Sequence, residues 1–445
     1  FDRQNHVALA WRNCHCCILM TFPAVAFSQP DLAADSEVKI ISFAGLGLLI
    51  FFGFLGYVVH LQLHQRPTMR LCVLGAMGLP MIVGPLVILN LYGPLRSKMA
   101  HFALSFFGVV AGFRWLELIL GTGPKGFDKS CRNFVIYFAS PAEVLFDDAG
   151  QLQASKDGLV SELLLRIGKH MLIGTVALSL GKATEFAPFL DHDPVTMPLL
   201  GFPVALPAMY LQTVYVYCTL ATAMLMHRLL PAFLGFDSVD SMQSPLLLST
   251  SLRDFWGRRW NLVVHRLMKR TFFVPVVGRS RWFAGFLAFL MSGLFHEYMW
   301  LAVNWNQMDA YVPGLSLIFF LLQFLLCGLE AALSVTMLGM RIAELPHVVR
   351  TVLTTLVILP FGPLFLQGIC QMGVEAAHQG QTISFVPETD GSSAISGAPP
   401  LDWMMCLLVG LVAGARGMWR KSPMKGLSTK TSTTVVAVLP TCEGA

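Results

Sequence analysis

The character of the chain is clearest in residues 281–303, which read RWFAGFLAFLMSGLFHEYMWLAV. A helix needs about 20 mostly apolar residues to cross the hydrocarbon core of a membrane, and this stretch meets that requirement. It is therefore predicted to be a transmembrane helix. His296 and Glu297 lie within it, and an ionisable side chain in mid-membrane costs about 2.5–3.5 kcal/mol on insertion scales, so this pair needs a reason.

Stretches of the same kind recur along the chain of 445 residues, of which 55% are hydrophobic and 13% charged. Soluble domains usually carry about 25% charged residues. The nine candidate spans are 39–61, 70–92, 100–120, 164–181, 201–230, 281–303, 311–340, 347–370 and 401–418. The sequence thus predicts an all-α polytopic membrane protein with about nine transmembrane helices.

Two of these stretches exceed one bilayer crossing. The stretch 201–230 contains Pro203 and Pro207, which we expect to break it. The stretch 311–340 should tilt, kink or extend along the membrane interface.

Basic residues sort the connections between the spans. Lys and Arg are concentrated in 122–163 and 231–280, whereas 182–200, 304–310 and 371–400 contain a single basic residue among them. Because cytosolic loops carry the excess of basic residues, the first two should be cytosolic and the other three lumenal. The net charge of +5 suits anionic lipid headgroups. It does not indicate nucleic acid, because the chain has no soluble basic module.

The chain is expected to divide into three parts. Residues 1–38 form an N-terminal segment that is either a lumenal start or a secretory signal, since Arg12 precedes a short apolar run. Residues 39–420 form one membrane-embedded domain, and the polar tail 421–445 should be a disordered cytosolic segment. The cluster at 14–17, Cys-His-Cys-Cys, contains metal-ligand residue types, but adjacent cysteines rarely provide four tetrahedral ligands, so we expect no metal.

A second informative block precedes the span 281–303. Residues 249–261 read STSLRDFWGRRWN, and Ser251 followed by Asp254 is a helix-start signature in which each side chain can accept from a free amide. Apolar residues then recur at spacings of three and four, namely Leu252, Trp256, Trp260, Val263 and Leu267. Polar residues with the same spacing are Asp254, Arg258, Asn261, His265 and Lys269. The pattern predicts one amphipathic helix.

Such a helix has two interpretations. The simpler one is an interfacial helix whose Arg and Lys side chains reach the headgroups. The other is a ligand site, because the amide of Asn261 adds nothing to headgroup attraction but can hydrogen-bond a ligand. Arg258 and Arg259 beside aromatic rings suit a phosphorylated aromatic ligand such as coenzyme A.

His296 also has more than one interpretation. A zinc peptidase motif requires a second His at position 300. That residue is Trp300, so the spacing excludes a zinc peptidase motif. A structural histidine packed against a neighbouring helix remains open. A neutral imidazole in a polar cavity is, however, the commonest general base. Ser292 and Gly293, one turn earlier, leave room for close approach of a backbone or a substrate, and Glu297 is expected to pair with a basic residue of another helix.

The blocks 251–261 and 292–297 together resemble the membrane-bound O-acyltransferases, and specifically their wax synthase branch. This resemblance implies a tunnelled helical fold that admits acyl-CoA from the cytosol and an alcohol from the bilayer. It implies that His296 is the general base and that Asn261 holds the thioester or stabilises the oxyanion. The expected substrate-binding residues are Ser251, Asp254, Trp256, Arg258, Arg259, Trp260, His265 and Ser292.

The resemblance implies acyl transfer from acyl-CoA to a lipid alcohol in the endoplasmic reticulum membrane, with wax ester as the product and no cofactor or metal. Its close part is residues 245–300, and His265 and the run 272–275 differ from the plant pattern, which leaves the acceptor and the chain length open. Alternative acceptors are diacylglycerol and a sterol or terpenoid alcohol. A transporter is the non-enzyme alternative, and the sequence is compatible with a homo-oligomer.

The two catalytic candidates present a geometric difficulty. The charge pattern places Asn261 at the cytosolic surface, whereas His296 lies 15 residues after Arg281, deep in its span. If the two meet, the segment 245–275 must dip into the membrane, or a solvated cavity must connect them.

Overall fold

The computed structural model describes residues 34–63, 67–92, 98–140, 142–183, 202–305 and 312–365. Within these ranges the chain is helical, and its only extended pairing is three isolated bridges, Val144–Ser238, Ala154–Phe236 and Phe146–Leu152. The all-α prediction is confirmed. The N-terminal cysteine cluster, the loop 371–400, the predicted span 401–418 and the tail lie outside the described residues.

The described residues form seventeen helical elements along the chain. They are α2 (Ala34–Leu63), α3 (Pro67–Tyr92), α4 (Lys98–Leu120), α5 (Cys131–Ala139), α6 (Leu159–Ala183), α8 (Phe202–Phe233), α9 (Pro245–Leu248), α10 (Leu252–Asp254), η3 (Phe255–Arg259), α11 (Leu262–Met268), η4 (Lys269–Phe273), α12 (Val274–Val277), α13 (Arg281–Val303), α14 (Leu315–Leu333), α15 (Met337–Glu344), α16 (His347–Ile358) and η5 (Leu359–Phe361).

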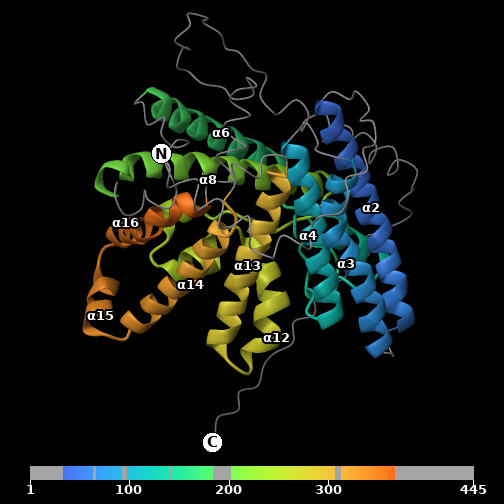
Figure 1. The fold of residues 1–445 in the computed structure, drawn as a ribbon. Coiled ribbons are helices and arrows are strands. Elements are labelled where there is room, and N and C mark those ends of the chain that lie inside the picture. Colours follow the sequence, from blue (N-terminus) through green and yellow to red (C-terminus); the bar gives the residue numbers. More distant parts are fainter. Residues whose placement is uncertain are drawn as a thin grey trace, which may run out of the picture.

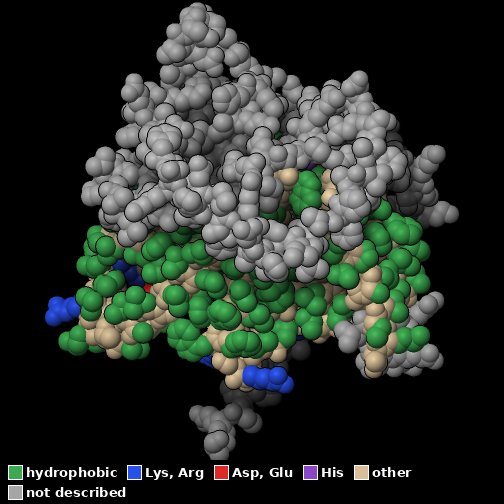
Figure 2. Space-filling model, in the orientation of Figure 1, with side chains coloured by type: hydrophobic (Ala, Val, Ile, Leu, Met, Phe, Trp, Pro, Cys, Tyr) green, Lys and Arg blue, Asp and Glu red, His purple; other side chains and the backbone are tan. Residues whose placement is uncertain are grey.

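Six helices of the described residues, α2, α4, α8, α13, α14 and the one formed by α16 with η5, are long and apolar enough to cross a membrane. A shorter apolar run, Gly75–Asn90, lies in α3, and α6 covers the predicted span 164–181. Figure 2 shows hydrophobic side chains covering most of the described surface on one face, with Lys and Arg confined to its lower and left edges. The chain is therefore a polytopic membrane protein. Six of its described helices meet the length and composition of a span, so the predicted count of nine is not confirmed.

The helices form two groups around α13 (Figure 1). Helices α2, α3 and α4 pack on one another, and α4 also packs along α13. Helices α6 and α8 form a pair and run across the top of the view, steeply inclined to α13. Helix α14 packs on the other side of α13. The span with His296 is therefore enclosed by neighbouring helices.

The two long apolar stretches behave differently from each other. Helix α8 is continuous from Phe202 to Phe233, so the predicted break at Pro203 and Pro207 is wrong. Pro203 is the second residue of the helix, where the amide has no intrahelical partner, and Pro207 is the sixth, so the helix continues through it at the cost of one hydrogen bond. The stretch 311–340 does extend as expected, because α14 ends at Leu333 and the separate helix α15 follows.

Gly293 allows α13 and α14 to approach closely one turn before His296. A Cβ atom added there would lie 2.9 Å from Leu317 Cδ1 and 3.0 Å from its Cα. We predict that Gly293→Ala lowers the free energy of unfolding by about 1–3 kcal/mol, because the extra methyl group pushes the helices apart. Thermal unfolding of the purified protein in detergent measures this change.

Gly285 on the same helix provides the matched control. A Cβ atom there would make an ordinary contact of 3.5 Å with the ring of Phe324. Because alanine favours a helix over glycine by about 0.8–1.0 kcal/mol, Gly285→Ala should be neutral or stabilising. Equal unfolding temperatures for the Gly285 and Gly293 variants would contradict the close packing at Gly293.

Candidate active site

The block before α13 begins with the predicted helix-start motif. Ser251 Oγ accepts a hydrogen bond from the amide of Asp254 at 3.0 Å, and Asp254 Oδ2 accepts from the amide of Thr250 at 3.3 Å. The helix start predicted from this pair is confirmed. Both residues thus serve the backbone, and this is the contact that the structure gives to Ser251.

The single amphipathic helix predicted after this start is wrong. Residues 255–259 form a wide π-helical turn, which shifts the register of the side chains. The helix then ends at Trp260, and Asn261 adopts a left-handed conformation with φ 41° and ψ 61°. The side chain of Asn261 begins a new helix, α11, by accepting from the amide of Val264 at 3.3 Å. Asparagine tolerates this conformation better than most residues, which permits the turn.

The first half of the segment lies against α14. The amide of Leu252 donates to Glu330 Oε1 at 3.0 Å, near the C-terminal end of α14. Further along, Trp256 Nε1 donates to Gln323 Oε1 at 3.2 Å, closer to the middle of α14. Residues 252–259 therefore run antiparallel to α14 and enter the helical bundle.

The second half returns along α13. Residues of α11 share an apolar cluster with Phe295 and Met299 of α13, and η4 and α12 also pack on α13. Since α12 is joined to α13 by the short turn 278–280, the two halves of this connection are antiparallel. The start of α11 thus lies beside the later part of α13.

Residues 251–277 therefore form a helical hairpin whose tip is Trp260 and Asn261. The sequence placed the two catalytic candidates at different depths unless this segment dips into the membrane. The contacts with α13 and α14 show that the hairpin packs against both of these predicted spans.

A network of buried charges attaches the returning half of the hairpin to α4. Arg270 Nε donates to Glu117 Oε1 at 2.7 Å, and its two terminal nitrogens each donate to Glu143 at 3.0 Å. Arg266 also reaches Glu143, at 3.3 Å, and the hydroxyl of Tyr137 donates to Glu117. Glu117 is 1% exposed and Glu143 4%, so loss of one partner would leave a buried charge unpaired. These groups stabilise the hairpin.

The imidazole of His296 is buried among aromatic rings in α13. Its Nδ1 lies 2.7 Å from the carbonyl oxygen of Ser292. Because a carbonyl oxygen only accepts, Nδ1 carries the proton and Nε2 carries the lone pair. The ring of Phe320 stacks on the imidazole at 4.7 Å between centroids, and that of Phe365 lies at 5.1 Å. In the neutral imidazole this bond sets the tautomer, with the lone pair on Nε2, and the rings hold the side chain in place.

Glu297, the neighbour of His296, supports a helix. Its Oε2 accepts from the amide of Gly314 at 2.9 Å and its Oε1 from the amide of Leu317 at 3.1 Å. A carboxylate at a helix N-terminus is stabilised by unpaired amides and by the helix dipole. The sequence predicted a basic side chain as the partner of Glu297, and the two bonds described here attach its carboxylate to the start of α14.

An apolar pocket lies beside Phe365, whose ring also contacts the imidazole of His296. Its cavity volume is about 50 Å³, which is below the usual size of ligand pockets. The lining residues most relevant here are Trp256, Trp260, Phe319, Thr355, Gly362 and Phe365. The hairpin, α14 and the end of α16 therefore line a small apolar pocket that shares Phe365 with the surroundings of His296.

The other predicted substrate-binding residues have different surroundings. Arg258 is exposed and can reach an external ligand. Arg259 is held by Asp254, with Nε and Oδ2 2.7 Å apart, so it supports the hairpin. His265 is half-buried in α11, and burial, with Lys269 and Arg266 adding to it, lowers its pKa to about 4. His265 is therefore uncharged at neutral pH and supplies no positive charge for a phosphate.

Sequence reasoning missed two polar residues of α14 that position the hairpin. Gln323 is fully buried, and its Nε2 has no hydrogen-bond partner among the described residues. Glu330 accepts from the amides of both Leu252 and Arg253. Each lies in the apolar stretch 311–340, so the signal that identified His296, a polar residue in a predicted span, could have found them.

The comparisons with known proteins concern this same region. The model of the membrane bound O-acyl transferase family matches residues 239–322, which include the hairpin, α13 and the first part of α14. A probable long-chain-alcohol O-fatty-acyltransferase 9 of Arabidopsis thaliana is 30% identical over 168 residues, 36% of this chain and 48% of the relative. This alignment thus spans about half the length of that relative.

Two further relatives extend the comparison. The long-chain-alcohol O-fatty-acyltransferase of Simmondsia chinensis is 28% identical over 318 residues, 68% of this chain and 84% of the relative. An acyl-CoA--sterol O-acyltransferase 1 of Arabidopsis thaliana is 39% identical over 74 residues, 14% of this chain and 21% of the relative. The family model covers both sequence blocks, 251–261 and 292–297, and over residues 239–322 the chain is similar to the membrane bound O-acyl transferase family.

Proposed function

We propose that this protein transfers a fatty acyl group from acyl-CoA to the hydroxyl of a long-chain alcohol, forming a wax ester. The names of the two relatives described as long-chain-alcohol O-fatty-acyltransferases support this acceptor. The observation that carries the proposal is the imidazole of His296, whose lone pair on Nε2 is held in place by the bond from Nδ1 to Ser292. Such a group can accept a proton from an alcohol without first losing one itself.

The reaction would proceed in two proton transfers. His296 Nε2 takes the proton of the acceptor hydroxyl as the oxygen attacks the thioester carbonyl. The carbon–sulfur bond then breaks, and the imidazolium returns the proton to the thiolate, which releases CoA. Since Oδ1 of Asn261 already accepts from Val264, its NH₂ group remains to donate to the oxyanion. These steps require no cofactor or metal.

The substrates would reach the site from two directions. The exposed Arg258 is suited to the phosphates of acyl-CoA on the cytosolic side. The small apolar pocket beside Phe365 is suited to a short part of a hydrocarbon chain arriving from the bilayer, since each buried methylene contributes about 0.8 kcal/mol. We place this activity in the endoplasmic reticulum membrane.

The proposal is tested in membranes from cells that lack neutral-lipid synthesis and express this chain. Labelled palmitoyl-CoA is supplied with a long-chain alcohol, diacylglycerol or a sterol, and the lipid products are separated. We expect wax ester, formed only with the alcohol and at the same rate as CoA release. Triacylglycerol or steryl ester in place of wax ester would identify diacylglycerol or a sterol as the acceptor. Absence of any ester would contradict the proposed acyltransferase activity.

A further inference from the structure

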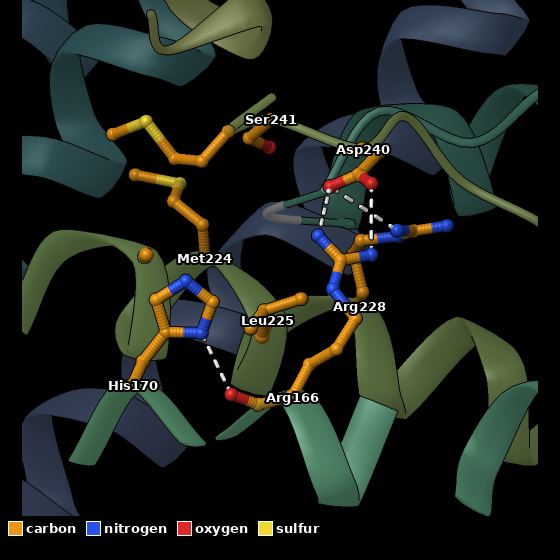
Figure 3. A pocket seen from close by; sticks show the side chains of 9 residues that line it. Arg166, His170, Met224, Leu225, Arg228, Asp240 and Ser241 are labelled. Atoms are coloured by element: carbon orange, nitrogen blue, oxygen red, sulfur yellow. Dashed lines mark hydrogen bonds and ion pairs between the residues drawn. The ribbon is translucent and has the colours of Figure 1, made fainter. Parts of the chain in front are cut away.

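Arg166, Arg228 and Asp240 lie together where α6, α8 and the loop after α8 meet (Figure 3). Arg166 of α6 binds Asp240 through both terminal nitrogens, at 2.8 and 3.1 Å. Arg228 of α8 reaches Asp240 at 3.4 Å and Asp237 at 3.2 Å. The carboxylate of Asp240 is therefore attached to two helices at once.

The residues that follow Asp240 hold the tip of the hairpin. Three hydrogen bonds join residues 241–243 to residues 259–262. They are Leu262 N to Ser241 O at 2.9 Å, Gln243 N to Arg259 O at 3.0 Å, and Asn261 N to Met242 Sδ at 3.4 Å. The stretch 241–243 thus bonds to Arg259 and Leu262, the residues on either side of the tip.

Asn261 needs such support. Its left-handed backbone, with φ 41°, is sparsely populated by residues other than glycine. A backbone of this kind persists when its surroundings determine it. The hydrogen bonds on both sides of the tip hold this backbone conformation, and the loop that makes them is anchored at Asp240.

We propose that Arg166 and Arg228 are positioning residues for acyl transfer, which act through Asp240 and the stretch 241–243 to orient the amide of Asn261. This proposal rests on the role of Asn261 in the proposed function. The two-pronged bond from Arg166 specifies the orientation of the carboxylate as well as its distance. The side chain of Arg228 is only 7% exposed, so salt screens the ion pair between Arg228 and Asp240 only weakly.

The sharpest test is Asp240→Asn, which keeps the size of the side chain, removes its charge and leaves one acceptor oxygen for the two arginines. Both arginines retain a carboxylate in this variant, because Arg228 keeps Asp237 at 3.2 Å and Arg166 keeps Glu162 at 3.7 Å. We expect kcat per folded protein to fall by about 10–10²-fold, as for a displaced catalytic group, with acyl-CoA affinity unchanged.

Two further variants of the cluster separate positioning from general stability. Arg166→Lys keeps the charge but loses the two-pronged contact, and should lower kcat by less than Asp240→Asn. Glu162→Gln removes another carboxylate near Arg166 without touching the loop, and should leave kcat normal. Glu162 is exposed, with 62% of its side chain accessible, so this control should fold.

A double-mutant cycle supplies the readout that a structural role would not produce. If Asp240 acts through Asn261, Asp240→Asn should have almost no further effect on kcat in an Asn261→Ala protein. If the double variant instead loses kcat by the product of the two single reductions, this proposal alone is overturned. A normal kcat in folded Asp240→Asn and Arg166→Lys would overturn it too. A normal kcat in Asn261→Ala would overturn the assigned role of Asn261 and this proposal together.

Discussion

Alanine at position 296 is expected to lower the turnover of ester formation by at least about 10²-fold, the usual contribution of a general base. The imidazole of His296 is oriented by the carbonyl of Ser292 and enclosed by the rings of Phe320 and Phe365. No methyl group can take the acceptor proton at that point. Acyl-CoA should still bind, because its contacts are assigned to the hairpin.

The measurement is the initial rate of ester formation per folded protein, with acyl-CoA binding determined separately. Glu297→Gln is the control on the adjacent residue, since it keeps the size of a side chain that caps α14. It should lower abundance or thermal stability and leave turnover per folded protein near normal. Near-normal turnover in folded His296→Ala would leave this histidine as a structural residue packed between aromatic rings.

Local patterns in the sequence predicted the parts of the site that depend on neighbours along the chain. The start of the hairpin follows from Ser251 and Asp254, whose bonds span three or four residues. The buried position of His296 follows from the apolar residues around it. These features need only helical geometry and the cost of placing a polar group in a membrane.

Tertiary contacts determine the parts that the sequence did not predict. The spacing of Trp256, Trp260 and Val263 continues across Asn261 as though one helix ran through it. The helix breaks because the stretch 241–243, in which Met242 precedes Asn261 by 19 residues, bonds to both sides of the tip. A period of three and four residues carries no information about such a contact, so the apolar faces before and after the tip were joined incorrectly.

The apolar pocket beside Phe365 was hidden for a related reason. Phe365 and Gly362 come from the last predicted span described by the structure, and Phe319 from α14. In an apolar stretch these residues look like any other lipid-facing side chains. Only the packing of α14 against α13, which Gly293 permits, identifies those that face inward.

The second large effect is expected at Asn261, where alanine removes the NH₂ group assigned to the oxyanion and should lower turnover by about 10²–10³-fold. Alanine also removes the acceptor for Val264 N and disfavours the left-handed backbone. A loss of activity in this variant alone could therefore reflect damage to the hairpin. Two other substitutions separate these effects.

Asn261→Asp keeps an oxygen that can accept from Val264 and a residue that tolerates φ 41°, but it replaces the donor by a carboxylate. Its turnover should fall at least as far as in the alanine variant, because a negative charge opposes the oxyanion. Asn261→Gly keeps the backbone conformation and loses the amide, so its turnover should fall as well while the protein stays folded. Substantial turnover in folded Asn261→Asp would show that position 261 acts only as the cap of α11, since the aspartate preserves that cap and removes the proposed donor.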